Sequence, residues 1–161
     1  MRNEQTLDLI ITFLSVSLPL SMSQYLHPDI DCIFVKSEEG LYSYTSPGNP
    51  SSTAAVCGLY VISESDQFVE FEFEDVQVQS CSAGGLLSVI DGWELNGQFF
   101  PGTKDHLLPK EMRYHEFCST TRPVGSYKMS QNVGLIEFRL PFLGDSFKLR
   151  VRFKSNPKRE F

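Results

Sequence analysis

Apolar and polar residues alternate along two stretches of the chain, as they do in half-buried β-strands. In residues 69–74 Val and Phe alternate with Glu, and in residues 147–154 Phe, Leu and Val alternate with Lys and Arg. The apolar phase shifts by one residue near Glu74-Asp75, which predicts a β-bulge there. Both stretches are therefore predicted as strands that turn one face toward a hydrophobic core.

Shorter apolar runs extend this pattern to further strand candidates, at residues 86–90, 93–95, 98–100 and 133–140. Asp91-Gly92 and Asn96-Gly97 separate the first three of these, and both dipeptides favour tight hairpin turns. Residues 37–53 are rich in Ser, Gly and Pro and are predicted as a long loop. About eight short strands without a convincing amphipathic helix predict an all-β sandwich, of jelly-roll type.

Two charged stripes accompany the two alternating strands, Glu70, Glu72 and Glu74 on one and Lys148, Arg150 and Arg152 on the other. They form either a docking surface or a set of ion pairs between neighbouring strands, and we favour the ion pairs because these help to fix strand register. Reversing the charges of Arg150 and Arg152 separates the two interpretations. It lowers stability if the stripes pair and ligand affinity if they dock.

The first 23 residues have the composition of a secretory signal peptide. Residues 9–20 are mostly apolar, too short a run to span a membrane, and Ser21-Met22-Ser23 offers small residues for cleavage after Ser23. We expect a signal peptide at residues 1–23, one domain at 24–155, a short polar tail at 156–161 and an extracellular location. A frayed N-terminal helix of a cytosolic protein is the alternative.

The chain has four cysteines, Cys32, Cys57, Cys81 and Cys118, all of which follow the predicted signal peptide. An even number of cysteines in a secreted chain predicts disulfides, and four cysteines permit three pairings. The sequential pairing joins Cys32 to Cys57 and Cys81 to Cys118. A zinc site with four thiolate ligands is an alternative, although no two of these cysteines form a CxxC pair.

The net charge and the histidine and cysteine motifs argue against nucleic-acid binding, membrane binding and catalysis. A net charge of −6 argues against nucleic acid and anionic membranes as partners, because both attract clustered positive charge. A thiol enzyme would use Cys118 with His115, three residues before it, but a disulfide is the simpler role for this cysteine. An extracellular hydrolase would need His106 or His115 beside a carboxylate and a free nucleophile. Asp105-His106 is instead expected to be a solvated loop pair.

Calcium binding has to be considered, because many extracellular β-sandwiches bind calcium. A calcium site in this chain would draw on the carboxylates of Glu70, Glu72, Asp75 and Asp91. The sequence supplies no compact group of them, and we predict no metal site, no catalytic residue and no cofactor.

Several segments in the second half of the chain carry a family resemblance. They are residues 89–97, Phe100-Pro101, residues 105–109, Arg113-Tyr114, residues 116–118, residues 130–133 and residues 136–139. In this order they resemble the N-terminal half of the corticotropin-releasing factor-binding protein family. The resemblance implies a CUB-like jelly-roll β-sandwich with sequential disulfides. It also implies a secreted protein that sequesters peptide hormones of the corticotropin-releasing factor and urocortin type, or a related diuretic hormone.

A binder of a helical peptide needs an exposed apolar groove, and Trp93, Phe99 and Phe100 near the Asn-Gly turn are the candidate ligand-binding residues. The alternative is that Trp93 and one Phe fill the core beside the Cys81–Cys118 bridge. Family members continue into a second domain, which we expect this chain to lack. A structural or interaction module of CUB type, or a truncated product without peptide binding, is therefore the alternative function.

Overall fold

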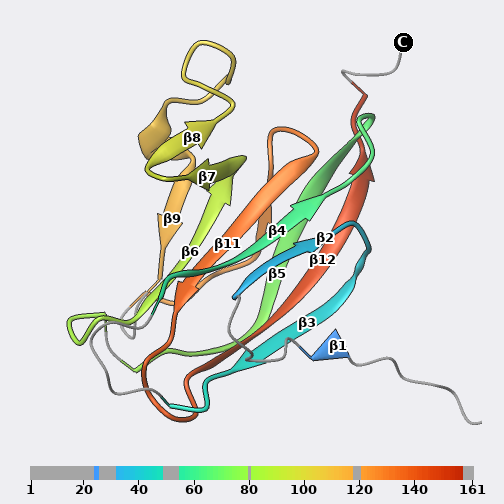
Figure 1. Cartoon of the computed structure of the whole chain (residues 1–161). Helices are drawn as coiled ribbons and strands as arrows, with labels where there is room; N and C mark the ends of the chain where they lie inside the picture. Colours follow the sequence, from blue (N-terminus) through green and yellow to red (C-terminus); the bar gives the residue numbers. More distant parts are fainter. Residues whose placement is uncertain (1–23, 26–31, 49–54, 80, 118–120, 158–161) are drawn as a thin grey trace, which may run out of the picture.

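Two five-stranded sheets account for most of the described chain (Figure 1). The structure is a computed structural model and describes residues 24–25, 32–48, 55–79, 81–117 and 121–157. Sheet A has the strand order β1 (Gln24–Tyr25), β3 (Gly40–Thr45), β12 (Ser146–Ser155), β5 (Gln67–Gln77), β10 (Ser126–Lys128). Sheet B has the order β2 (Ile33–Lys36), β4 (Cys57–Ile62), β11 (Val133–Arg139), β6 (Leu86–Asp91), β9 (Tyr114–Glu116).

The core lies between the facing sides of the two sheets. Sheet A contributes Phe71 and Leu149, and sheet B contributes Leu59, Ile136 and Phe138, all of them fully buried. Because side chains alternate between the faces of a strand, the residues between these positions lie on the outer faces of the sandwich. The all-β sandwich predicted from the sequence is confirmed.

The two strands with the clearest alternation, β5 and β12, lie side by side as antiparallel neighbours in sheet A. Arg150 is opposite Glu72 and Arg152 is opposite Glu70 in their register. The register shifts between Lys148 and Leu149, so that Glu74 has no partner of its own in the ladder. This irregularity is the predicted bulge near Glu74-Asp75, and the structure confirms it.

The outer face of these strands carries the predicted ion pairs. Lys148 Nζ lies 3.3 Å from Glu74 Oε2, and Arg150 pairs with the other oxygen of the same carboxylate. Arg152 Nη1 lies 2.6 Å from Glu72 Oε2. The structure therefore supports the interpretation that the two stripes neutralise one another across the sheet.

Strand β3 corrects one prediction, because it lies within the segment expected to be a long loop, residues 37–53. It pairs with β12, and Tyr42 on its inner face is only 2% exposed. Ser, Gly and Pro flank this strand and dominated the composition of the window. Its own residues, Leu, Tyr and Thr among them, suit a pleated surface.

The two Gly-containing dipeptides have different roles. Asn96 and Gly97 have φ values of 51° and 81° and form the turn of a hairpin between β7 (Trp93–Leu95) and β8 (Gln98–Phe100), as predicted. Asp91-Gly92 is not a hairpin turn, because β6 and β7 do not pair with one another. Gly92, with a φ of 105°, bends the chain instead, and the hairpin leaves the end of β6 as a separate two-stranded sheet (Figure 1).

The disulfide prediction is confirmed for its first bridge, Cys32–Cys57. This bridge links the residue before β2 to the first residue of β4, and the two strands run parallel. Cys81 is also disulfide-bonded, and its sulfur lies 3.5 Å from the carbonyl oxygen of Phe117. Cys118, the next residue, lies outside the described residues, so the second bridge stays a prediction.

The predicted signal peptide, residues 1–23, also lies outside the described residues. Within the part of the chain that the structure describes, no helix is long and apolar enough to span a membrane. The single short helical turn of that part, η1 (Lys110–Met112), precedes β9.

Candidate functional site

The outer face of sheet B is unusually apolar along its β2 edge. Ile33 and Val35 of β2 are 60% and 61% exposed, and Ile62 of β4 is 39% exposed. The alternate positions of the same strands point inward, with Phe34 packed against the core and Leu59 fully buried. Strands β2 and β4 therefore carry apolar residues on both faces. The core needs only those of the inner face, so the exposed apolar residues of the outer face are candidates for contact with a partner.

The hairpin β7–β8 continues this apolar surface. Trp93, Leu95 and Phe100 are 38%, 49% and 36% exposed. The Trp93 ring packs on Phe100, with centroids 5.1 Å apart, and meets the ring of Tyr60 on β4 edge-on at 6.4 Å. We call the exposed residues of the two elements the hairpin–sheet surface: Ile33, Val35, Ile62, Trp93, Leu95 and Phe100.

The predicted ligand-binding residues thus gather on one hairpin, although Phe99 lies apart from the other two. Phe99 is half-buried, with the ammonium of Lys110 lying 4.3 Å from its ring centroid. The alternative expectation that Trp93 fills the core is wrong. The bend at Gly92 carries the hairpin out of sheet B, so Trp93 packs on the outer face of the sandwich.

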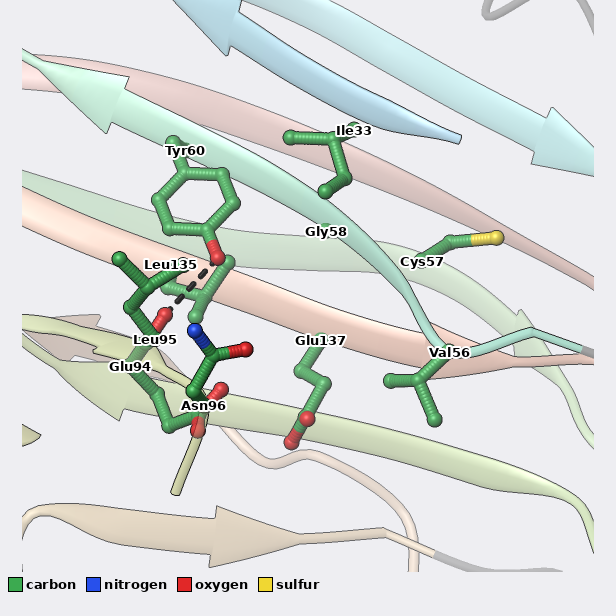
Figure 2. Close-up of a pocket in the computed structure, with 10 residues that line it drawn as sticks. All are labelled: Ile33, Val56, Cys57, Gly58, Tyr60, Glu94, Leu95, Asn96, Leu135 and Glu137. Atoms are coloured by element: carbon green, nitrogen blue, oxygen red, sulfur yellow. Dashed lines mark hydrogen bonds between the residues drawn. The ribbon is translucent and has the colours of Figure 1, made fainter. Parts of the chain in front are cut away.

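Tyr60 fastens the hairpin to sheet B. Its hydroxyl donates a hydrogen bond of 2.9 Å to the carbonyl oxygen of Glu94, shown as the dashed line in Figure 2. Tyr60 also lies opposite Leu135 of β11 in the ladder, and Leu135 is only 1% exposed. The hairpin therefore has a fixed position over the outer face of β4 and β11.

A pocket of about 200 Å³ opens between the hairpin and sheet B (Figure 2). Its aliphatic lining comes from Ile33, Val56, Leu95 and Leu135, and its polar lining includes Tyr60, Glu94, Asn96 and Glu137. Gly58 leaves the space open at its base. A Cβ atom at this position would lie 2.8 Å from the Tyr60 ring and 3.3 Å from a methyl group of Leu135.

The pocket is acidic. Burial raises the pKa of Glu137, and the negative charges of Glu94 and Glu116 raise it further. A hydrogen bond of 3.2 Å from the Ser88 hydroxyl and the positive charge of Arg139 oppose these effects. Burial likewise raises the pKa of Tyr60, with smaller contributions from Glu94 and Glu137. No Lys or Arg among the described residues lies within 4 Å of either carboxylate in an ion pair.

A buried polar cluster holds the base of the hairpin, and sequence analysis did not find it. Arg113, with no exposed surface, donates to the carbonyl oxygens of Asp91 (2.9 Å), Phe100 (3.0 Å) and Pro101 (2.7 Å). Burial lowers the pKa of its guanidinium, and the nearby charge of Asp91 opposes this effect. Nothing in the local sequence marks Arg113 as buried, because arginine is almost always exposed.

Asp91 connects this cluster to a distant loop. Its carboxylate accepts hydrogen bonds from the backbone N–H (2.7 Å) and the hydroxyl (2.5 Å) of Ser130. His106 Nε2 lies 3.4 Å from the same carboxylate, while its Nδ1 accepts the N–H of Leu108. The expectation that His106 is solvated is wrong, since the residue is 8% exposed and folds over the end of β6.

The arrangement differs from that of a hydrolase. The hydroxyl of Ser130 donates to the carboxylate of Asp91, whereas nucleophilic catalysis needs a hydroxyl in contact with an imidazole base. His115 is exposed on β9 and packs beside the ring of Tyr127, with centroids 5.4 Å apart. Neither candidate histidine therefore forms the constellation that the enzyme alternative requires.

The carboxylates considered for calcium do not gather. Glu70 and Glu72 face Arg152 on sheet A, and Asp91 lies in the buried cluster at the end of sheet B. Among the described residues, no group of three or more His, Cys, Asp or Glu side chains is placed to hold a metal ion.

Comparisons of the sequence with a family model and with known proteins point to the same family. Residues 24–155 match the model of the corticotropin-releasing factor binding protein N-terminal domain. The chain is 33% identical over 125 residues to corticotropin-releasing factor-binding protein of Homo sapiens, covering 78% of this chain and 37% of that protein. It is 32% identical to the protein of the same name from Ovis aries, with the same coverage, and 32% identical over 133 residues to that of Xenopus laevis, covering 83% and 40%.

Two solved structures overlap with the sandwich at lower similarity. The full extracellular region of zebrafish Gpr126/Adgrg6 gives a TM-score of 0.49 at 15% identity, over 78% of this chain and 15% of that one. The MASP-1 CUB2 domain bound to Ca²⁺ gives a TM-score of 0.42 at 14% identity, over 74% of this chain and 96% of that domain.

Proposed function

The chain belongs to the corticotropin-releasing factor-binding protein family, and on this premise we propose that it is a secreted protein that binds a peptide hormone of the corticotropin-releasing factor type. The hormone would be of the urocortin or diuretic hormone type. The curated relatives carry this ligand in their names, and the chain spans 37% of the length of the first of them. Binding by this chain alone is therefore the property to test.

The hairpin–sheet surface is the observation that carries the proposal. It combines two exposed aliphatic residues of β2, Ile33 and Val35, with exposed Trp93 and Leu95 of the hairpin. An amphipathic helix binds by laying its apolar face on such a surface, with aromatic and aliphatic residues as anchors. Because Tyr60 holds the hairpin against sheet B, the surface is formed before the peptide arrives, which lowers the entropic cost of binding.

The mode of action follows from the same features. Noncovalent burial of apolar side chains removes the peptide from solution without chemical change, so the protein acts by sequestration. The Cys32–Cys57 disulfide supports an extracellular location, because disulfides persist in oxidising compartments.

The test is titration calorimetry of a corticotropin-releasing factor peptide into the oxidised full chain, secreted from eukaryotic cells. We compare Leu95→Asp with the control Leu143→Asp, because both leucines are exposed, at 49% and 75%, and only Leu95 lies on the hairpin–sheet surface. Leu95→Asp should weaken binding by about tenfold or more, the scale of 1.4 kcal/mol or above expected for an anchor residue. Leu143→Asp should leave affinity unchanged, and absence of binding by the unaltered chain refutes the proposal.

One alternative has a specific observation in its favour. This chain matches only 37% of the length of its human relative. The alternative is that it is a CUB-type structural module, which binds the peptide only together with further parts of such a longer protein. Under that alternative the chain alone shows no affinity, and fusing it to the remaining part of the human relative restores binding.

A further inference from the structure

We propose that the pocket at Gly58 receives a basic side chain, Lys or Arg, of the bound peptide. The inference rests on the proposed function and deepens it, because it assigns one side-chain class of the ligand to one place on the protein. The neighbouring hairpin–sheet surface would then hold the apolar face of the same helix.

The shape of the pocket suits a long side chain with a charged end. Its aliphatic lining, from Ile33, Val56 and Leu95 among others, can cover the methylene groups of Lys or Arg. Its carboxylates, Glu94 from the hairpin and Glu137 from β11, can bind the charged end. In the view of Figure 2, Glu137 and Asn96 are drawn on the side of the pocket away from Ile33.

The charges of the pocket contrast with those of sheet A. On sheet A, the glutamates of β5 lie within ion-pair distance of Lys148, Arg150 or Arg152. Among the described residues, no Lys or Arg forms an ion pair with Glu94 or Glu137, although the charge of Arg139 acts on Glu137 from a longer distance and the N–H of Gly97 donates to the carboxylate of Glu94. The same chain thus neutralises its acidic strand internally and presents this acidic pocket to a ligand.

The partial burial of Glu137 favours a cation over an apolar side chain in this place. Burial already disfavours the charged form of Glu137 and raises its pKa. An apolar side chain would remove more water and leave the carboxylate with the Ser88 hydroxyl but without a charged partner in contact, which costs free energy. A cation would supply that partner, lower the pKa of Glu137 and release a proton from any protonated fraction.

The first experiment is a double-mutant cycle by titration calorimetry with the full chain. The protein variants are Glu137→Gln, Glu94→Gln and, as a matched control, Glu64→Gln, an exposed glutamate outside the pocket. The peptides are a corticotropin-releasing factor peptide and versions of it in which each Lys or Arg is replaced by Gln, one at a time. Gln keeps the size and shape of Glu, so the pocket is preserved.

We expect Glu137→Gln to weaken binding about tenfold, the size of one charge-assisted hydrogen bond, and Glu64→Gln to have no effect. One of the Gln-substituted peptides should bind unaltered protein equally weakly and lose nothing further with Glu137→Gln. Additive losses for every peptide, or full affinity of Glu137→Gln, overturn the inference while leaving the proposed function intact. Absence of binding by the unaltered chain overturns both.

The second experiment measures proton release on binding, in two buffers of different ionisation enthalpy and at several pH values above the ordinary carboxyl pKa, because the pKa of Glu137 is raised. Unaltered protein should release protons when it binds the peptide, and Glu137→Gln should release fewer. Gly58→Ala provides a steric check, because the new methyl group would contact the Tyr60 ring and narrow the base of the pocket. Equal proton release by both proteins contradicts the inference.

Discussion

Arg152 makes its short ion pair with Glu72, 2.6 Å away, rather than with Glu70, which is directly opposite in the ladder but 3.9 Å from the same nitrogen. The guanidinium therefore bridges two carboxylates on the same face of β5. Diagonal contacts of this kind are within reach of long side chains on a twisted antiparallel pair. Glu74, which binds Lys148 and Arg150, forms a second group of ion pairs beside them in the same charged network on the outside of sheet A.

Charge reversal tests this network. Arg150→Glu combined with Arg152→Glu should lower the free energy of unfolding by about 1–2 kcal/mol, because exposed attractive pairs become repulsive ones. Urea denaturation measures the loss, and adding Glu72→Lys with Glu74→Lys should recover much of it. Loss of peptide affinity with unchanged stability would favour the docking interpretation instead.

Arg113 should be essential for the position of the hairpin. Its replacement by Met leaves the carbonyl oxygens of Asp91, Phe100 and Pro101 buried without their donor, at a cost of about 3 kcal/mol or more. Hydrogen exchange should accelerate at the backbone amides of residues 93–100, and thermal stability should fall. Arg139→Met is the control, because Arg139 is only half-buried and, among the described residues, donates to one carbonyl oxygen, that of Gly84. Equal effects of the two substitutions would contradict the prediction.

The raised pKa of Glu137 should make the folded protein less stable as pH rises, the opposite of the usual effect of a carboxylate in an ion pair. Because its pKa is raised in the folded state, mainly by burial, the native protein binds this proton more tightly than the unfolded chain does. The stabilising contribution of protonated Glu137 is fully present below the ordinary carboxyl pKa. It is lost as pH rises through the raised pKa of the folded state. Without peptide, Glu137→Gln should therefore gain melting temperature relative to unaltered protein as pH rises from below the ordinary carboxyl pKa to above the raised one.

Glu74→Gln is the matched comparison and should show the opposite trend. Although desolvation acts to raise the pKa of Glu74, its hydrogen bonds to Arg150 and Lys148 lower it overall. Its stabilising contribution is present above the ordinary pKa and is lost as pH falls through the lowered value. Thermal melts of both variants over the same pH series measure the two signs, and the same trend for both would refute the assignment.

The Cys32–Cys57 disulfide should contribute about 3.5 kcal/mol, the loop-entropy value for a bridge between residues 25 positions apart. Cys32→Ala with Cys57→Ala should lower the free energy of unfolding by about this amount in urea denaturation. Retention of full stability would show that the entropy of this loop has little effect. Peptide mapping without reduction tests the predicted Cys81–Cys118 bridge in the same material.

The sequence by itself determined the features that depend on neighbouring residues. The alternation in β5 and β12, the bulge at Glu74 and the turn at Asn96-Gly97 could all be predicted, because side-chain alternation and positive φ values are local properties. The family could also be recognised, because segments spread along residues 89–139 match it in order.

The tertiary structure decided everything that joins distant segments. Strand β3 forms because β12 offers it an edge, and Arg113 is buried because Gly92 bends the chain and brings Phe100 and Pro101 over it. The pocket at Gly58 combines side chains from β2, β4, β11 and the hairpin. Which strands become neighbours depends on the packing of the whole core, and local periodicity carries no information about that choice.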